Sequence, residues 1–159
     1  MSWAIRRMVA GDLDAVLTLE QKIPEAPHWN RQEYERCLTS DETASLRRVG
    51  FVAEVDVYIV GFSIGKLVAG VCELESVAVA TDARGQGIGT ALLSAVTAWA
   101  ESSGAYRFEL EVRASNTRAI ELYERAGIRR EGQRAGYYHS PDDDALLMGA
   151  SLPSGGKLA

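Results

Sequence analysis

A glycine-rich segment that begins with an arginine is the first candidate for chemistry. Residues 83–93 have the sequence ARGQGIGTALL, with glycines at alternate positions. An apolar pattern with helical spacing follows at once. A helix N-terminus presents unpaired N–H groups and about half a positive charge, and glycines let a phosphate approach the backbone closely. The segment is therefore typical of an anion-binding loop, or of a glycine-rich turn that only packs a helix against a strand.

Two common phosphate-binding motifs fit this segment poorly. A Walker A loop requires a lysine before its Ser or Thr, whereas Gly89 precedes Thr90 here. A dinucleotide-binding GxGxxG motif opens a βαβ unit and needs a third glycine where Thr90 stands. Four predicted strands come first, although Glu109 lies near the distance at which a ribose-binding acid would be sought. The first motif is excluded and the second is weakly supported.

Two pairs of glutamates are candidates for general acid and base chemistry. Glu73 and Glu75 share one face of the predicted strand CELESVAV, and Glu109 and Glu111 share one face of FELEVR, because strand side chains alternate. The commoner fate of such a glutamate is a solvated charge on a strand face. Spacing alone leaves both interpretations open.

Periodicity and cap residues predict the elements that position these groups. A short strand at WAIRRMV precedes a helix over about residues 12–22. Asn30 and Glu33 form a capping box for a second helix, with Trp29 packing on Tyr34 across the cap. Strands rich in Val, Ile and Phe then follow, broken at Asp56 and at a glycine turn near residue 70.

The second half of the chain alternates helices and strands. A helix after the glycine segment stops at Gly104, a strand follows, and a helix over residues 115–127 ends at Gly127. Residues 136–152 are expected to form a loop and a final strand. The predicted order is β-α-α-β-β-β-α-β-α-β-β, an α+β fold with a mostly antiparallel sheet.

Composition describes an ordinary globular chain. The 159 residues suit one domain over residues 1–152 with a flexible tail over 153–159. No signal peptide or run of about 20 apolar residues is present, so a cytoplasmic protein is expected. The net charge of −5 disfavours nucleic-acid binding. Cys37 and Cys72 form no CxxC motif, which predicts buried free thiols and no metal site.

Arg84, Gly87 and Gly89 match the pattern R-x-x-G-x-G directly after the strand ESVAVA. This pattern resembles the acetyl-CoA pyrophosphate loop of the GNAT N-acetyltransferase superfamily. LEVRASNTRAIELYERAGI and GYYHSPDDDALLM resemble the corresponding segments of its ribosomal-protein-alanine (RimI-type) group. The similarity runs from about residue 50 to 150, whereas the first 50 residues match in element order only. It implies a GNAT fold with a mixed, mostly antiparallel sheet of about seven strands and about four helices.

The resemblance implies acetyl-CoA as co-substrate, without a metal, and a set of residues that hold it. Backbone N–H groups of residues 85–90 would bind the pyrophosphate, and the main chain at Val77–Val79 would bind the pantetheine, with the Val79 N–H near the thioester oxygen. Asn116 would bond the pantetheine arm or its surroundings, although it equally suits a helix cap. The implied cofactor-binding residues are Val77, Ala78, Val79, Arg84, Gly85, Gln86, Gly87, Ile88, Gly89, Thr90, Asn116 and Tyr123.

Acetyl transfer to an amine by direct attack needs a neutral amine, a polarised carbonyl and stabilisation of the leaving thiolate. At pH 7 an α-amino group costs about 1 kcal/mol to deprotonate and a lysine about 4.6 kcal/mol, so a protein N-terminus needs only a modest base. The resemblance points to Glu111 as the base, and other branches of the superfamily place a glutamate where Glu73 stands. Tyr123 would donate a proton or hydrogen bond to the CoA sulfur, unless it is only a packed helix tyrosine.

The implied acceptor is a protein N-terminus, such as that of a ribosomal protein. No nucleic-acid or membrane partner is expected, and the enzyme itself is expected to be a monomer or a weak homodimer. Tyr137 and Tyr138 resemble paired tyrosines that close over a substrate peptide, and Glu75 is a candidate at the substrate fringe. The acidic CELES strand departs from the group, which leaves the protein substrate open. Two alternatives are a small amine acceptor (an amino acid, polyamine or drug) and a non-catalytic acyl-CoA-binding module, and the presence of Glu111 with Tyr123 disfavours the second.

Overall fold

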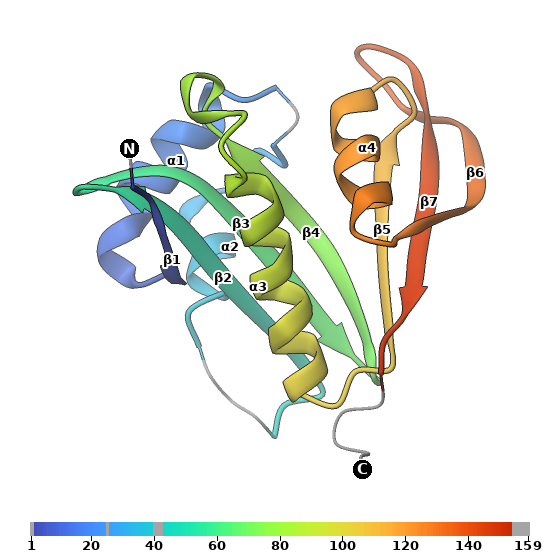
Figure 1. Ribbon diagram of the computed structural model, residues 1–159, viewed down its shortest axis with the longest axis horizontal. Coiled ribbons are helices and arrows are strands. Elements are labelled where there is room, and N and C mark those ends of the chain that lie inside the picture. Colours follow the sequence, from blue (N-terminus) through green and yellow to red (C-terminus); the bar gives the residue numbers. More distant parts are fainter. Residues whose placement is uncertain (1, 25, 40–42, 154–159) are drawn as a thin grey trace.

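A seven-stranded sheet organises the computed structural model, which describes residues 2–24, 26–39 and 43–153 (Figure 1). The strand order is β1-β2-β3-β4-β5-β7-β6. The strands are β1 (Ala4–Arg7), β2 (Leu46–Val55), β3 (Tyr58–Val68), β4 (Val71–Val79), β5 (Arg107–Arg113), β6 (Arg129–Tyr138) and β7 (Asp143–Ser151). The helices are α1 (Leu13–Gln21), α2 (Arg31–Glu35), α3 (Ile88–Ser102) and α4 (Thr117–Arg125), with 3-10 turns at Ala10–Asp12 and Thr81–Ala83.

The predicted order of elements and fold class are confirmed. Neighbouring strands are antiparallel except β4 and β5, which are parallel. One boundary differs from the prediction, because β6 extends through Tyr137 and Tyr138, which were expected to lie in a loop. Pairing of Tyr138 with Asp143 on β7 continues the ladder to that point. The predicted tail lies outside the described residues apart from Pro153.

Helices cover the sheet on two faces, and each face has its own apolar cluster. α3 and α4 pack on one face, where Trp99 and Ile120 join Cys72 and Phe108 in a buried cluster. α1 and α2 pack on the other face against β2 and β3. Adjacent side chains of one strand therefore point to opposite faces of the sheet and pack in different clusters, because strand side chains alternate. Both cysteines are buried free thiols, as predicted.

β4 and β5 pair only at their beginnings. The paired positions are Val71 with Arg107, Cys72 with Phe108, and Glu73 with Glu109. From there the two strands diverge, which is visible between β4 and β5 in Figure 1. A register shift at Ile64/Gly65 of β3 leaves an extra residue on β4 at this level. Such a bulge bends a strand and increases its twist, so β4 turns away from β5.

The β3–β4 turn fixes the point at which the divergence starts. Ala69 and Gly70 both have positive φ, as a two-residue type I′ hairpin requires. The Gly70 carbonyl accepts a hydrogen bond from the Tyr106 N–H at 2.8 Å, just before β5 begins. A Cβ on Gly70 would lie 2.6 Å from the Tyr106 ring. Glycine at this position therefore allows both the turn and the close approach of β5.

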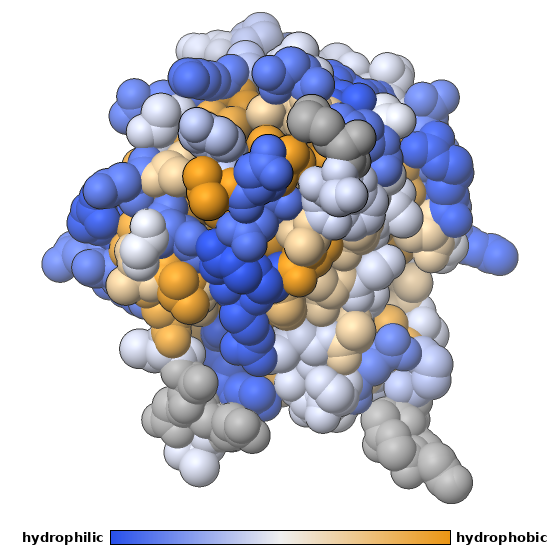
Figure 2. All heavy atoms as spheres, turned by 60° about the vertical axis from the view of Figure 1, so that its left-hand side comes forward, coloured by the Kyte–Doolittle hydropathy of each residue, from blue (hydrophilic) through white to orange (hydrophobic). Residues whose placement is uncertain are grey.

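Figure 2 shows the side of the molecule that carries β1 and the β2–β3 turn. On this side, exposed apolar residues lie in separate groups among polar ones. Val57 and Tyr58 in that turn are among the exposed large apolar side chains. Across the described ranges, no helix is long and apolar enough to cross a membrane.

A charged pair anchors the start of α1 to the first strand. The two terminal nitrogens of the Arg6 guanidinium, Nη1 and Nη2, each donate to the Asp12 carboxylate at 2.8 Å, and the Val9 N–H donates to the same group at 2.8 Å. Asp12 is 6% exposed. The bond from Arg6 holds the pKa of Asp12 below its ordinary value of 3.8, against the opposing effect of burial. The entry into α1 thus depends on a buried, ionised carboxylate.

Asp12→Asn is expected to lower the free energy of unfolding by about 2 kcal/mol at pH 7, a figure reduced because the partner Arg6 is partly exposed. Since the folded pKa is lowered, the stabilisation is fully present above the unfolded pKa and is lost as the pH falls through the folded pKa. Urea denaturation at neutral and acid pH should show the gap between wild type and variant closing in acid. Asp14→Asn, which alters an exposed carboxylate, is the control. Equal losses in both variants at every pH would contradict the assignment.

Candidate active site

A cavity opens where β4 diverges from β5, bordered by the N-terminus of α3 and one side of α4. Its lining is Ile23, Val77, Ala78, Val79, Ala83, Arg84, Gly85, Gly87, Ile88, Gly89, Thr90, Asn116, Arg118, Ala119, Leu122 and Arg125. The lining therefore includes most of the residues that the resemblance assigned to cofactor binding. Gln86 and Tyr123 are outside it. The cavity has three arginines and no acidic side chain among the described residues that line it.

The N-terminus of α3 points unpaired backbone donors toward this cavity. Gly87 is the N-cap with φ of 87°, and no side chain caps the helix in the described part of the chain. The first bond within the helix comes from the Ala91 N–H to the Gly87 carbonyl, at 3.1 Å. A long helix with free N-terminal donors attracts an anion through both the N–H groups and the helix dipole.

The glycines keep the loop before α3 open. A Cβ built on Gly85 meets no atom within 4 Å, and one on Gly87 meets only the Trp3 ring at 3.8 Å. Both glycines have positive φ, so a side chain there would be strained rather than crowded. Glycine is needed for the left-handed backbone, which turns the chain from the Thr81–Ala83 turn into α3.

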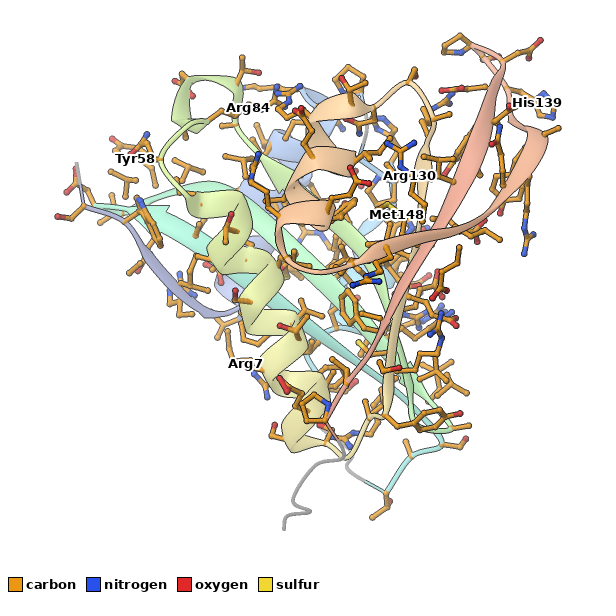
Figure 3. The ribbon with its side chains drawn as sticks, turned by 45° about the vertical axis from the view of Figure 1, so that its right-hand side comes forward. Arg7, Tyr58, Arg84, Arg130, His139 and Met148 are labelled. Carbon is orange, nitrogen blue, oxygen red and sulfur yellow. The ribbon has the colours of Figure 1, made fainter. Side chains whose placement is uncertain are left out.

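Side chains of the loop tie it back to β4. The Arg84 Nε donates to the Val79 carbonyl at 3.1 Å, and the Gln86 amide donates to the Ala83 carbonyl at 3.3 Å. Figure 3 shows Arg84 in this loop, on the side toward α4. Arg84 therefore both shapes the loop and contributes a positive charge to the cavity. Gln86, in contrast, bonds only to Ala83 within the loop among the described residues.

One side of α4 supplies the cavity residues that sequence reasoning missed. Arg118, Ala119, Leu122 and Arg125 follow the i, i+1, i+4, i+7 spacing of a single helix face. This spacing was available in the sequence, but which face of α4 meets the cavity was not. Ile23, from the segment after α1, and Ala83 were also missed. Asn116 caps α4, since its Oδ1 accepts from the Ala119 N–H at 3.3 Å, and it also lines the cavity, while its bond to the pantetheine arm stays a prediction.

Glu111, Tyr138 and Tyr123 are linked electrostatically, and we refer to these three residues as the polar cluster. Glu111 raises the pKa of Tyr138, in second place after burial, and Tyr138 in turn raises the pKa of Tyr123, again after burial. Tyr123 is 6% exposed, and within the described residues its hydroxyl makes no hydrogen bond. A raised pKa keeps this hydroxyl protonated at neutral pH, so it is a proton donor with no competing acceptor.

The Glu111 carboxylate is incompletely partnered. Its Oε2 is buried and has no hydrogen-bond partner in the described part of the chain. The Arg134 Nε lies 3.9 Å away, beyond hydrogen-bond distance. A buried acceptor without a donor is costly, by about 1–3 kcal/mol, and is uncommon outside functional sites. Glu111 Oε2 therefore lies beside the positive charge of Arg134 and still has its hydrogen-bonding position open to a ligand.

The other predicted glutamates are engaged in ion pairs on the same sheet face. Glu73 lies 3.2 Å from Lys66, and Glu75 pairs with Arg48 at 2.9 Å. Glu109 pairs with Arg107 at 2.7 Å. A second hollow on this face contains Glu73, Glu109, Glu111, Glu131 and Arg134. It brings Glu73 and Glu111 together, and of the two only Glu111 has the unpartnered buried oxygen.

Tyr137 and Tyr138 pack edge to face, with ring centroids 5.1 Å apart. The Arg113 guanidinium lies 4.4 Å from the Tyr138 ring and holds it beside Glu111, whereas Tyr137 is 45% exposed. His139 lies at the tip of the β6–β7 hairpin, away from Arg84 (Figure 3). The two tyrosines thus differ, because one joins the polar cluster and the other faces solvent.

The family model of the Acetyltransferase (GNAT) family matches residues 13–128. The chain belongs to the GNAT acetyltransferase family. This GNAT enzyme is 33% identical over 139 residues to the ribosomal protein bS18-alanine N-acetyltransferase of Escherichia coli K12, covering 86% of this chain and 89% of that protein.

Solved structures agree with the family. The crystal structure of the Escherichia coli ribosomal-protein-S18-alanine N-acetyltransferase superposes with a TM-score of 0.83 at 28% identity, covering 99% of each chain. Arabidopsis thaliana NAA60 in complex with acetyl-CoA gives a TM-score of 0.80 at 19% identity, with 95% of this chain and 99% of that chain covered. The second likeness concerns the fold. The GNAT acetyltransferase predicted from the glycine loop and α4 is confirmed, and the roles of individual residues remain predictions.

Proposed function

We propose that this GNAT enzyme transfers the acetyl group of acetyl-CoA to the N-terminal α-amine of a protein, by direct attack of the amine. The observation that carries the proposal is the cationic cavity at the free N-terminus of α3, together with the unpartnered buried oxygen of Glu111 and the protonated hydroxyl of Tyr123 on α4. The similarity to the Escherichia coli enzyme that acts on a ribosomal-protein alanine supports the choice of acceptor.

The chemistry of the cavity suits acetyl-CoA. The α3 N–H groups would bind the pyrophosphate, with Arg84, Arg118 and Arg125 as positive charges for the phosphates. The apolar lining from Val77 to Val79 and from Ala119 and Leu122 would hold the pantetheine arm. Bound acetyl-CoA would supply the thioester, and the protein's own groups would position the amine and move protons.

Glu111 is the proposed base. Its free oxygen accepts the proton of the incoming amine, directly or through water, and an α-amine needs little help at neutral pH. Glu73 is less suited, because Lys66 already pairs with it and its side chain is partly exposed. Tyr123 is the proposed acid, since its hydroxyl is protonated and holds a proton for the leaving sulfur.

Mass spectrometry of a peptide panel incubated with acetyl-CoA tests the acceptor. The panel contains peptides with free N-terminal Ala or Ser, lysine peptides with blocked N-termini, and small amines. Acetylation is expected on the free α-amine, because the lysine amine costs about 3.6 kcal/mol more to deprotonate at pH 7. Thiol release with a small amine and no peptide product would instead identify a small-molecule acetyltransferase.

Glu111→Gln is expected to lower kcat/KM by about 10²-fold or more, the usual contribution of a general base. The matched substitution Glu73→Gln, which removes an ion-paired and partly exposed carboxylate, should change kcat/KM by less than about threefold. Steady-state rates of thiol release measure both variants. A larger loss in Glu73→Gln would transfer the role of base to Glu73.

Tyr123→Phe is expected to lower kcat by about 10²-fold while the Kd for acetyl-CoA changes by less than about twofold, since only the acidic proton is lost. Turnover assays measure the first quantity and calorimetric titration the second. Tyr106→Phe alters an exposed tyrosine and serves as the control. Unchanged turnover in Tyr123→Phe would reduce Tyr123 to a packing residue.

A further inference from the structure

Glu20 is a buried carboxylate that the proposed mechanism does not use. It lies in the last turn of α1 and is 2% exposed. Its Oε1 accepts two hydrogen bonds, from the Trp29 N–H at 2.7 Å and from the Tyr34 hydroxyl at 2.6 Å. Buried carboxylates are rare unless such partners satisfy them. The two donors to Glu20 lie near the far end of the segment that links α1 to α2, of which residues 22–24 and 26–30 are described, and within α2 itself.

The Tyr34 end of this contact is rigid. Tyr34 is completely buried in α2, and its ring meets Phe62 of β3 edge to face, with centroids 5.8 Å apart. Burial, and then the bond to Glu20, raises the pKa of Tyr34, so its hydroxyl stays a donor. Glu20 therefore joins the end of α1 to a side chain that is fixed on the sheet.

The other end of the contact holds the linking segment. The Trp29 backbone is bonded to Glu20, and its ring packs on Tyr34 with centroids 5.3 Å apart. The Arg48 guanidinium lies 6.0 Å from the Trp29 ring and pairs with Glu75 of β4. A continuous path of contacts thus runs from Glu20 through Trp29 and Arg48 to Glu75 of β4.

The same segment forms part of the cavity. Ile23 is 2% exposed and lines the cavity together with Val77, Ala78 and Val79 of β4. The Ile23 N–H donates to the Glu20 carbonyl at 3.2 Å, and the Ala26 N–H donates to the Ile23 carbonyl at 3.1 Å. Within the described ranges, Ile23 is the cavity residue contributed from before β4. Its position depends on where the segment is held.

We propose that Glu20 is a positioning residue: by binding Trp29 and Tyr34 it locks the described residues 22–24 and 26–30, so that Ile23 closes the cavity that it shares with Val77–Val79, where the pantetheine arm would lie. This inference rests on the proposed function. Glu20 touches neither the cavity nor the catalytic groups, and it acts through the backbone of the segment. The phosphate-binding end, built by α3 and α4, does not depend on it.

Glu20→Gln and Tyr34→Phe test the proposal in the full-length enzyme. The first keeps the side-chain shape but removes the charge that strengthens both bonds, and the second removes one bond and leaves the other. Hydrogen exchange followed by mass spectrometry should show residues 22–30 exchanging about tenfold faster or more in Glu20→Gln, and by a smaller factor in Tyr34→Phe. Exchange in α3 and β5 should match the wild type. Glu35→Gln, the same change at an exposed position of α2, should alter nothing.

Calorimetric titration of acetyl-CoA provides the second readout. In Glu20→Gln the Kd for acetyl-CoA should rise about tenfold, and in Glu35→Gln it should stay within about twofold, because the Ile23 wall of the cavity moves only in the first variant. Equal exchange of residues 22–30 in wild type and Glu20→Gln would overturn the proposal. So would a uniform increase in exchange that includes α3, since Glu20 would then stabilise only the fold as a whole. Exchange needs no acceptor, so failure of the proposed function would be recognised separately in the peptide panel.

Discussion

Hydrogen bonding between β4 and β5 stops after three residue pairs, and the functional site depends on this interruption. Two parallel strands that stayed paired would leave no space between them. The bulge opposite Ile64/Gly65 turns β4 away, and the turn at Gly70 holds the paired end together. The freed end of β4 then lies beside the N-terminus of α3 and one face of α4. A cavity with unpaired backbone donors follows from the geometry of one strand.

The charge around the cavity is positive, whereas the net charge of the whole chain is negative. The protein has a net charge of −5, yet three arginines and a helix N-terminus border the cavity, with no acid among its described lining. The acidic residues gather on the opposite sheet face, where most of them pair with Lys66, Arg48 or Arg107. Glu111 is the exception with its unpartnered buried oxygen. The three arginines and Glu111 thus line two separate hollows that share no lining residue.

Buried polar groups connect the N-terminal region to this opening. Asp12 binds Arg6 at the start of α1, and Glu20 binds Trp29 and Tyr34 near its end. Each carboxylate is satisfied by donors from another element, so each fixes a helix relative to the sheet as well as avoiding the cost of burial. Both acids lie in the first 50 residues, which resemble the RimI group only in the order of their elements.

Local patterns in the sequence were sufficient for the order of elements, the capping box of Asn30 and Glu33, the contact of Trp29 with Tyr34, and the glycine loop, because each depends on residues close together in the chain. The α4 arginines, the contrast between Glu111 and Glu73, and the role of Ile23 were decided by tertiary structure. Spacing places Arg118 and Arg125 on one helix face, but only packing determines which face meets the cavity. Similarly, strand alternation groups Glu73 with Glu75 and Glu109 with Glu111, but only the pairing of β3 with β2 and β4 brings Lys66 to Glu73 and Arg48 to Glu75, and only burial in the folded chain leaves Glu111 Oε2 without a hydrogen-bond partner among the described residues.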